Sequence, residues 1–240
     1  MSATELARAA AVRVTASVGY RMTRLSARLQ TEQVAAQQEV GPTLAGDRDV
    51  EWAWALSQLR AEPGDVLDFG AGHGLLSLGA AFRGHRVVAV DLEPQSFMFT
   101  HEAIEYRQGD LNDMDIGTSA FDQVLNCSTV EHVGLEGRYG AVDDADGDLR
   151  AMAKLAAALR PEGTMVLSVP VGRDAVYAPY HRVYGERRLA QLIEPFALVR
   201  EEFRAKTGSP TWQPVDRETA LATQGSAAYY AIGLFVLRPR

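Results

Sequence analysis

The chain has 240 residues, 47% of them hydrophobic, and a formal net charge of −7 at pH 7. This length and composition are typical of a globular domain with a sizeable core. The negative charge argues against sequence-independent binding to nucleic acid, which needs a basic surface. No apolar run is long enough to cross a bilayer, and Cys127 is the only cysteine, so no intrachain disulfide forms. We therefore expect a cytoplasmic protein with no membrane and no nucleic-acid partner.

An apolar stripe at helical spacing, from Val14 to Leu29, predicts one or two helices over Thr4–Val40. Gly41 and Pro42 end this segment. It either covers the mouth of a site as a lid or packs at the seam of a homodimer, and the stripe does not distinguish the two. Its arginines could also suit a transit peptide or a membrane-surface helix, but a solvated basic face is the simpler interpretation. We divide the chain into residues 1–48, this N-terminal extension, and residues 49–240, the main domain.

Strands and helices are predicted to alternate after a first helix over Asp49–Arg60, which indicates a parallel sheet with helices on both faces. The predicted strands are Asp65–Phe69, Arg86–Asp91, Glu105–Arg107, Phe121–Cys127, Thr164–Val169, Ala197–Phe203 and Tyr229–Leu237. The later predicted helices are Gly74–Arg83, Gln95–Ala103, Asp148–Leu159 and Glu186–Ile193. Between the last two strands, Thr207–Gly225 is predicted to be a long polar loop, and loops of this length are usually functional or disordered.

The first strand leads into a glycine-rich turn that reads D-F-G-A-G-H-G from Asp68 to Gly74. Glycine lets a ligand approach the backbone, because a side chain would block it. The spacing G-x-G-x-G lacks the third glycine of the dinucleotide pattern G-x-G-x-x-G. Asp68 would repel a pyrophosphate but attract an ammonium or sulfonium group. S-adenosylmethionine (SAM) carries both cations and no phosphate, so the turn favours SAM over a nicotinamide dinucleotide; a plain strand–helix turn is the alternative.

The next strand ends are expected to meet at the same edge of the sheet. Asp91 ends the second strand at a distance that suits an acid bound to ribose hydroxyls. Asp110, after the third strand, could lie by the adenine amino group, and the fourth strand ends under the same crevice. The predicted cofactor-binding residues are Asp68, Gly70, Ala71, Gly72, His73, Asp91, Leu92, Asp110, Leu111, Asn126 and Cys127.

This ordered set of strand ends resembles the class I SAM-dependent methyltransferases, over roughly Glu51 to the C-terminus. The resemblance implies an α/β fold with a Rossmann-like, doubly wound, seven-stranded, mostly parallel sheet and an antiparallel C-terminal strand. It implies a transferase that moves a methyl group from SAM to a small molecule. The N-terminal helical extension would be an addition to that fold.

Two further stretches resemble a more specific, poorly characterised methyltransferase-like family: S-T-V-E-H-V-G-L before a helix opened by G-D, and H-R-x-Y-G after the fifth strand. Its members are often found with sugar and surface-polysaccharide genes, which implies a hydroxyl oxygen of a sugar-like or natural-product acceptor. N- or C-methylation, or a non-catalytic partner subunit with the SAM fold, stays open. The matching residues are Glu131, His132, Tyr139, Gly147, Asp148, His181, Arg182, Tyr184 and Gly185.

His132 and His181 are the predicted catalytic residues, since a histidine with a reference pKa of about 6.5 can accept a proton near neutrality. His181 is placed slightly ahead because Tyr180 and Arg182 flank it. For His132, a structural role at the cofactor pocket is the equal alternative. Arg182 could hold a carboxylate or phosphate bidentately, or else form a salt bridge to a loop acid. The predicted substrate-binding residues are Tyr139, Tyr180, Arg182 and Tyr184.

Acidic residues gather before the helix at Asp148 and raise the question of a metal site. They fail the EF-hand pattern, because Val142 stands where the first ligand would be. We expect a solvated loop in which Asp146 or Asp148 caps the helix, and no metal ligands; a magnesium site for acceptor hydroxyls is the alternative. Cys127 is expected to be a small packed residue and not a nucleophile.

Overall fold

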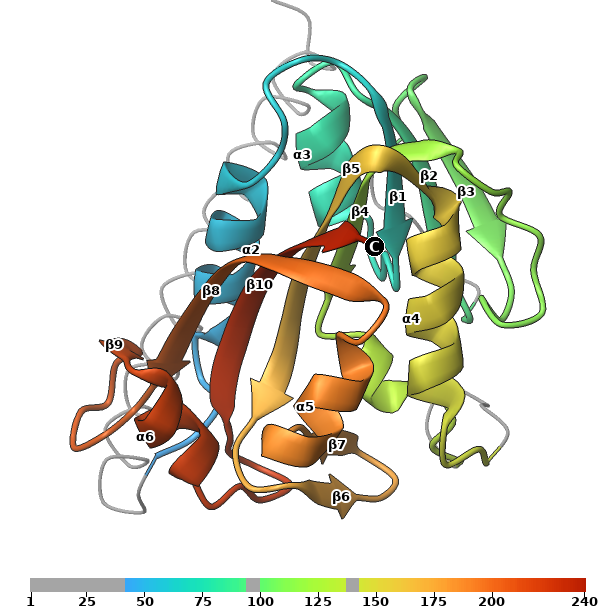
Figure 1. Ribbon diagram of the computed structural model, residues 1–240. Coiled ribbons are helices and arrows are strands. Elements are labelled where there is room, and N and C mark those ends of the chain that lie inside the picture. The colour runs from blue at the N-terminus through green and yellow to red at the C-terminus, as the bar shows by residue number, and fades with distance from the viewer. Residues whose placement is uncertain (1–41, 94–99, 137–142) are drawn as a thin grey trace, which may run out of the picture.

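The computed structural model describes residues 42–93, 100–136 and 143–240 (Figure 1). The predicted N-terminal helices over Thr4–Val40 lie outside these residues, so their role as lid or dimer seam stays a prediction. The described chain forms an eight-stranded sheet in the order β3-β2-β1-β4-β5-β10-β8-β9 and a separate two-stranded hairpin, β6-β7. No helix within the described ranges combines the length and hydropathy that a bilayer span requires.

The elements follow the predicted alternation closely. The strands of the large sheet are β1 (Asp65–Phe69), β2 (Arg86–Asp91), β3 (Ile104–Gln108), β4 (Phe121–Cys127), β5 (Leu159–Val171), β8 (Phe196–Ala205), β9 (Gln213–Val215) and β10 (Ala231–Pro239). The hairpin consists of β6 (Ala175–Tyr177) and β7 (His181–Val183). The helices are α2 (Asp47–Ser57), α3 (Leu75–Ala81), α4 (Gly147–Ala158), α5 (Glu186–Leu192), α6 (Arg217–Ala222) and the short 3-10 helix η1 (Val130–His132).

The central strands are parallel, and the sheet closes with an antiparallel strand. β1 pairs in parallel with both β2 and β4, and β4 pairs in parallel with β5. β10 runs antiparallel between β5 and β8, so the predicted Rossmann-like fold with an antiparallel C-terminal strand is confirmed. The chain turns to opposite sides of β1 to build β2 and β4, and ligands in such sheets bind outside the carboxyl ends of the strands at this switch point.

Helices cover both faces of the sheet, as Figure 1 shows for α2 and α3 on one side and α4 and α5 on the other. Met152 and Leu155 on one face of α4 pack into a buried cluster with the central strands. The opposite cluster includes Trp54 of α2 and Leu76 of α3. The inner strands are therefore buried on both sides, and this explains why they read as continuous apolar runs in the sequence.

The strand count and two segments differ from the prediction. The sheet has an eighth strand because β9 adds a short edge to β8, and the segment expected to be a loop, Thr207–Gly225, contains β9 and α6. Asp216 starts α6 by accepting a hydrogen bond from the Thr219 amide at 2.7 Å, a capping signal that the sequence analysis overlooked. The predicted helix over Gln95–Ala103 does not reach its expected end, because residues 100–103 lead into β3 through a turn; residues 94–99 lie outside the description.

Helix α2 is fixed to the carboxyl edge of the sheet by a buried acid. Glu51 is fully buried, and its carboxylate accepts hydrogen bonds from the hydroxyls of Ser128, after β4, and Ser168, on β5. Arg48 forms an ion pair with it at 2.8 Å. Burial raises the pKa of Glu51, and Arg48 and the serines oppose that rise. The beginning of α2 is thereby held beside the ends of β4 and β5.

We expect Glu51→Ala to lower the free energy of unfolding by about 2–4 kcal/mol, because two buried hydroxyls lose their shared acceptor. Glu51→Gln keeps an acceptor oxygen and should cost less. Urea denaturation at pH 7 measures both. A Glu51→Ala protein within about 0.5 kcal/mol of wild type would mean that this contact does not anchor the helix.

Candidate functional site

A cavity of about 450 Å³ opens at the carboxyl ends of the central strands, within the size range of small-molecule sites. Its lining comes from the turns after β1, β2, β3 and β4 and from the loop that follows η1. All predicted cofactor-binding residues except Asn126 line it. The sequence-based expectation that separate strand ends converge on one crevice is therefore met by the geometry of the sheet.

The turn after β1 contains three glycines, and the surroundings of Gly70 differ from those of Gly72. Gly70, Gly72 and Gly74 all have positive φ, at 74°, 52° and 79°, which residues with a Cβ rarely adopt. A Cβ on Gly70 would lie 2.1 Å from Oγ1 of Thr129, whereas a Cβ on Gly72 would meet nothing within 4 Å. At Gly70 the turn therefore packs tightly against Thr129, which follows β4, and at Gly72 it leaves open space.

Asp91 ties the end of β2 to the glycine turn. Its Oδ2 accepts a hydrogen bond from the Gly72 amide at 2.8 Å, and its Oδ1 accepts one from the Glu93 amide at 3.0 Å. Each carboxylate oxygen has a second lone pair, so the group can still accept bonds from ligand hydroxyls. Asp110, after β3, accepts a bond from the Asn112 amide at 2.8 Å and lies in the same lining.

Asp68 is a buried acid at the floor of the cavity. It is 2% exposed, and the Ser77 hydroxyl donates to its Oδ2 at 2.6 Å. Burial raises the pKa of Asp68 to about 6; the hydrogen bonds from Ser77 oppose the rise, and the neighbouring charge of Asp91 adds to it. A cation placed beside this carboxyl group would favour its ionised form.

The two residues at the end of β4 lie differently from each other. Asn126 is fully buried beneath the cavity, where its Nδ2 lies 3.7 Å from the sulfur of Met152, so it does not contact the cavity as expected. Cys127 does line the cavity, with its thiol 3.1 Å from the Ser168 hydroxyl. Burial raises the pKa of the Cys127 thiol well above its usual value, which keeps it protonated and poorly nucleophilic.

Of the two predicted catalytic histidines, only His132 lines the cavity. Its Nδ1 lies 2.5 Å from the backbone oxygen of Tyr180. A carbonyl oxygen only accepts, so Nδ1 carries a hydrogen, and in the neutral ring Nε2 then has the lone pair. Nε2 lies 3.7 Å from a Glu131 carboxylate oxygen, a separation at which the two groups form an ion pair when the ring is protonated.

His181 instead packs into the protein. It is 4% exposed, and its ring lies against the rings of Tyr177 and Tyr230 at centroid distances of 5.8 and 5.0 Å. Its Nε2 is 3.3 Å from the backbone oxygen of Ser226. Of these two histidines, His132 therefore meets the cavity and His181 does not, although His181 was the one favoured from the sequence.

The predicted substrate-binding residues are mostly engaged elsewhere. Arg182 is 4% exposed and donates to backbone carbonyls, and Tyr184 is fully buried with its hydroxyl 3.2 Å from Asp148. Burial raises the pKa of Tyr184 well above its usual value. Neither residue lines the cavity, so a direct role in substrate binding gains no support. Tyr180 is half-exposed, and Tyr139 lies outside the described residues.

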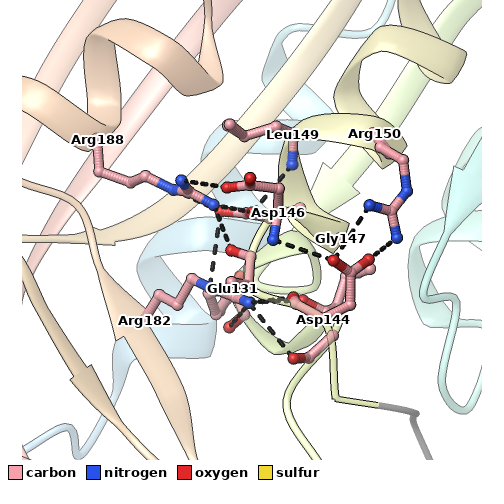
Figure 2. A network of polar contacts seen from close by, with 12 residues as sticks. Glu131, Asp144, Asp146, Gly147, Leu149, Arg150, Arg182 and Arg188 are labelled. Atoms are coloured by element: carbon pink, nitrogen blue, oxygen red, sulfur yellow. Dashed lines mark hydrogen bonds and ion pairs between the residues drawn. The ribbon is translucent and has the colours of Figure 1, made fainter.

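The acidic cluster before α4 is neutralised by arginines (Figure 2). Arg188 pairs with both Asp146 and the fully buried Asp148, and Arg150 pairs with Asp144. Of the two residues expected to cap α4, Asp146 occupies the N-cap position but its side chain makes no capping hydrogen bond. Asp148, in the first turn, accepts a bond from the Leu149 amide at 2.9 Å. The described residues contain no group of three or more histidine, cysteine or acidic side chains arranged to hold a metal ion.

Two lining residues were missed by the sequence analysis. Arg48 and Trp52 lie four positions apart on α2 and share one helix face, which forms a wall of the cavity. Arg48 is the one lysine or arginine in the described lining. Helix α2 was predicted from the sequence, but the spacing of its apolar residues does not show which face of the helix lines the cavity.

The fold is shared with SAM-dependent methyltransferases of class I. The 1,6-didemethyltoxoflavin-N1-methyltransferase of Burkholderia thailandensis, solved with 1,6-didemethyltoxoflavin and S-adenosylhomocysteine, is 24% identical, with a TM-score of 0.58 over 90% of this chain and 89% of that chain. A TehB-like SAM-dependent methyltransferase from Corynebacterium glutamicum is 17% identical, with a TM-score of 0.52 over 79% and 88%. The [4+2]-cyclase SpnF is 12% identical, with a TM-score of 0.56 over 80% of each chain.

At the level of sequence, residues 102–223 match the family model described as "Caenorhabditis protein of unknown function, DUF268". The chain belongs to this DUF268 family. No curated protein shows significant similarity to it.

Gly70→Ala and Gly72→Ala form a matched pair. Gly72→Ala should cost about 1–2 kcal/mol of stability, the penalty for a Cβ in a left-handed conformation. Gly70→Ala should cost about 1–3 kcal/mol more, because its Cβ also overlaps Thr129. Chemical denaturation of both variants tests the difference, and equal losses of stability would contradict the packing described for Gly70.

Asp68→Asn should stabilise the ligand-free protein at pH 7.5, by at most about 3 kcal/mol. The pKa of Asp68 is higher in the folded state than in the unfolded state, so folding is penalised wherever the carboxyl group must ionise. That penalty is absent below about pH 4 and complete above about pH 6. Thermal melts at pH 4.5 and 7.5 should therefore show a gain that is larger at pH 7.5; a variant that is less stable at both would contradict it.

Proposed function

We propose that this chain is a SAM-dependent methyltransferase that methylates a small molecule at a hydroxyl oxygen, on a sugar-like or natural-product acceptor. The observation that carries the proposal is that the glycine turn, Asp91 and Asp110 all line one cavity at the ends of four neighbouring strands, β3, β2, β1 and β4. The S-adenosylhomocysteine bound to the Burkholderia thailandensis enzyme supports it.

The residues present fit SAM. Gly72 opens on free space, where a Cβ would meet nothing within 4 Å, so a ligand can approach the backbone there. Asp110 and Asp91 would hold the adenine and ribose, since both keep acceptor capacity. Asp68 is a buried acid with a raised pKa, and a neighbouring cation such as the amine or sulfonium of SAM would stabilise its ionised form. Arg48 gives the cofactor carboxylate a positive partner.

When bound, SAM supplies an activated methyl group for in-line transfer, and the chain supplies position and a proton acceptor. His132 lines the cavity, and in its neutral form the contact between Nδ1 and the Tyr180 carbonyl puts the lone pair on Nε2. A neutral alcohol must lose its proton during methylation, so a base at this place favours an oxygen acceptor. N-methylation is the second candidate, because the Burkholderia thailandensis neighbour is an N1-methyltransferase.

The fold alone does not decide the reaction, because the cyclase SpnF has it as well. A non-catalytic partner subunit would also retain SAM binding. Binding and transfer must therefore be measured separately: first affinity for the cofactor, and then methyl transfer from labelled SAM to a panel of hydroxyl- and amine-bearing acceptors. Binding without transfer to any of them would favour the partner-subunit alternative.

Calorimetry should show that the protein binds S-adenosylhomocysteine and not NAD. Asp91→Ala should weaken that binding by about 1.5–3 kcal/mol, the worth of hydrogen bonds to a charged acceptor, or about 10- to 150-fold. Asp113→Ala removes an exposed acid outside the lining and should change nothing. Preference for NAD, or full affinity in Asp91→Ala, would overturn the assignment.

A further inference from the structure

The β6–β7 hairpin holds the loop that carries His132 at two points. At the first, the Tyr180 carbonyl lies against Nδ1 of His132. At the second, two residues along the chain, Arg182 reaches the backbone of the same loop. The hairpin is itself fixed to the segment before β10, because the Tyr177 hydroxyl donates to the Gly225 carbonyl at 2.6 Å.

The guanidinium group of Arg182 forms hydrogen bonds with the beginning and the end of the segment between η1 and α4. It donates to the carbonyls of Val133 and Asp144, at 2.5 and 3.1 Å, and lies 3.5 Å from those of Glu131 and Gly134. Figure 2 shows Arg182 reaching this turn from the side opposite Arg150. A planar fork with five donors can span several carbonyls at once, whereas a lysine ammonium cannot.

The charge of this buried guanidinium is balanced by Asp148. Nε of Arg182 lies 3.8 Å from an Asp148 oxygen, and the two side chains are 4% and 0% exposed. The same carboxylate accepts a bond from Tyr184 and pairs with Arg188. Arg182 and Tyr184 of the H-R-x-Y-G stretch thus face the loop and α4 and not the cavity.

We propose that Arg182 is a positioning residue for His132. By fixing the loop from Glu131 to Gly134, it keeps Nδ1–H of His132 on the Tyr180 carbonyl and leaves the lone pair on Nε2 in the cavity. In a neutral histidine, a hydrogen bond made by one ring nitrogen decides which of the two nitrogens carries the hydrogen. The catalytic value of this arrangement rests on the proposed function, but the tautomer can be measured without any acceptor.

The test is nitrogen NMR of the histidine rings in the full chain. The chain has five histidines, and His132→Gln assigns the signal of His132. In the wild type, neutral His132 should be in the Nδ1–H form alone. Arg182→Lys, which keeps the charge beside Asp148 but loses the fork, should give a mixture of tautomers and a shifted titration of His132.

Matched controls separate positioning from general damage. Tyr180→Ala keeps the backbone carbonyl and should leave the His132 tautomer unchanged. His73 and His85 lie outside the hairpin and should keep their wild-type signals in Arg182→Lys, which shows that the fold is intact. Calorimetry with S-adenosylhomocysteine on the same samples tests the proposed function independently.

Two results would overturn the inference. One is a wild-type His132 that carries its hydrogen on Nε2, which needs no variant to observe. The other is an Arg182→Lys protein in which His132 keeps the wild-type tautomer and titration. A wild type that fails to bind S-adenosylhomocysteine would count against the methyltransferase proposal and would leave the tautomer result standing.

Discussion

The hydrogen bond from the Gly72 amide to the Asp91 carboxylate is the contact on which the site depends. It joins the turn after β1 to the end of β2 at 2.8 Å, and the donor residue, Gly72, has a positive φ. With this bond in place, backbone and carboxylate face one cavity. Gly70 fixes the other side of the turn, because only a residue without a Cβ fits against Thr129.

Charge is distributed unevenly around this cavity. Four acids of the lining, Asp68, Asp91, Glu93 and Asp110, lie at or just after the ends of β1, β2 and β3, whereas Arg48 stands on the wall made by α2. Glu51 holds that wall against β4 and β5. A ligand with cationic and hydroxyl groups along its length and a carboxylate at one end is complementary to this pattern, which is the physical basis of the SAM proposal.

Local sequence signals were enough to predict the sheet and the residues that line the cavity at its edge. Buried parallel strands appear in the sequence as apolar runs, and the glycines and acids of the cavity stand at their ends. Contacts between distant segments could not be predicted. His181 and Arg182 have the chemistry of an active site, but tertiary packing buries them away from the cavity, whereas His132 lines it. The hairpin strands are three residues each, too short for a periodic signal.

A crystal structure of the protein with S-adenosylhomocysteine tests the central claim most directly. The account predicts both ribose hydroxyls within hydrogen-bond distance of the Asp91 carboxylate, with the adenine beside Asp110 and the amino acid end between Asp68 and Arg48. A ligand bound elsewhere, or one whose ribose lies away from Asp91, would contradict it.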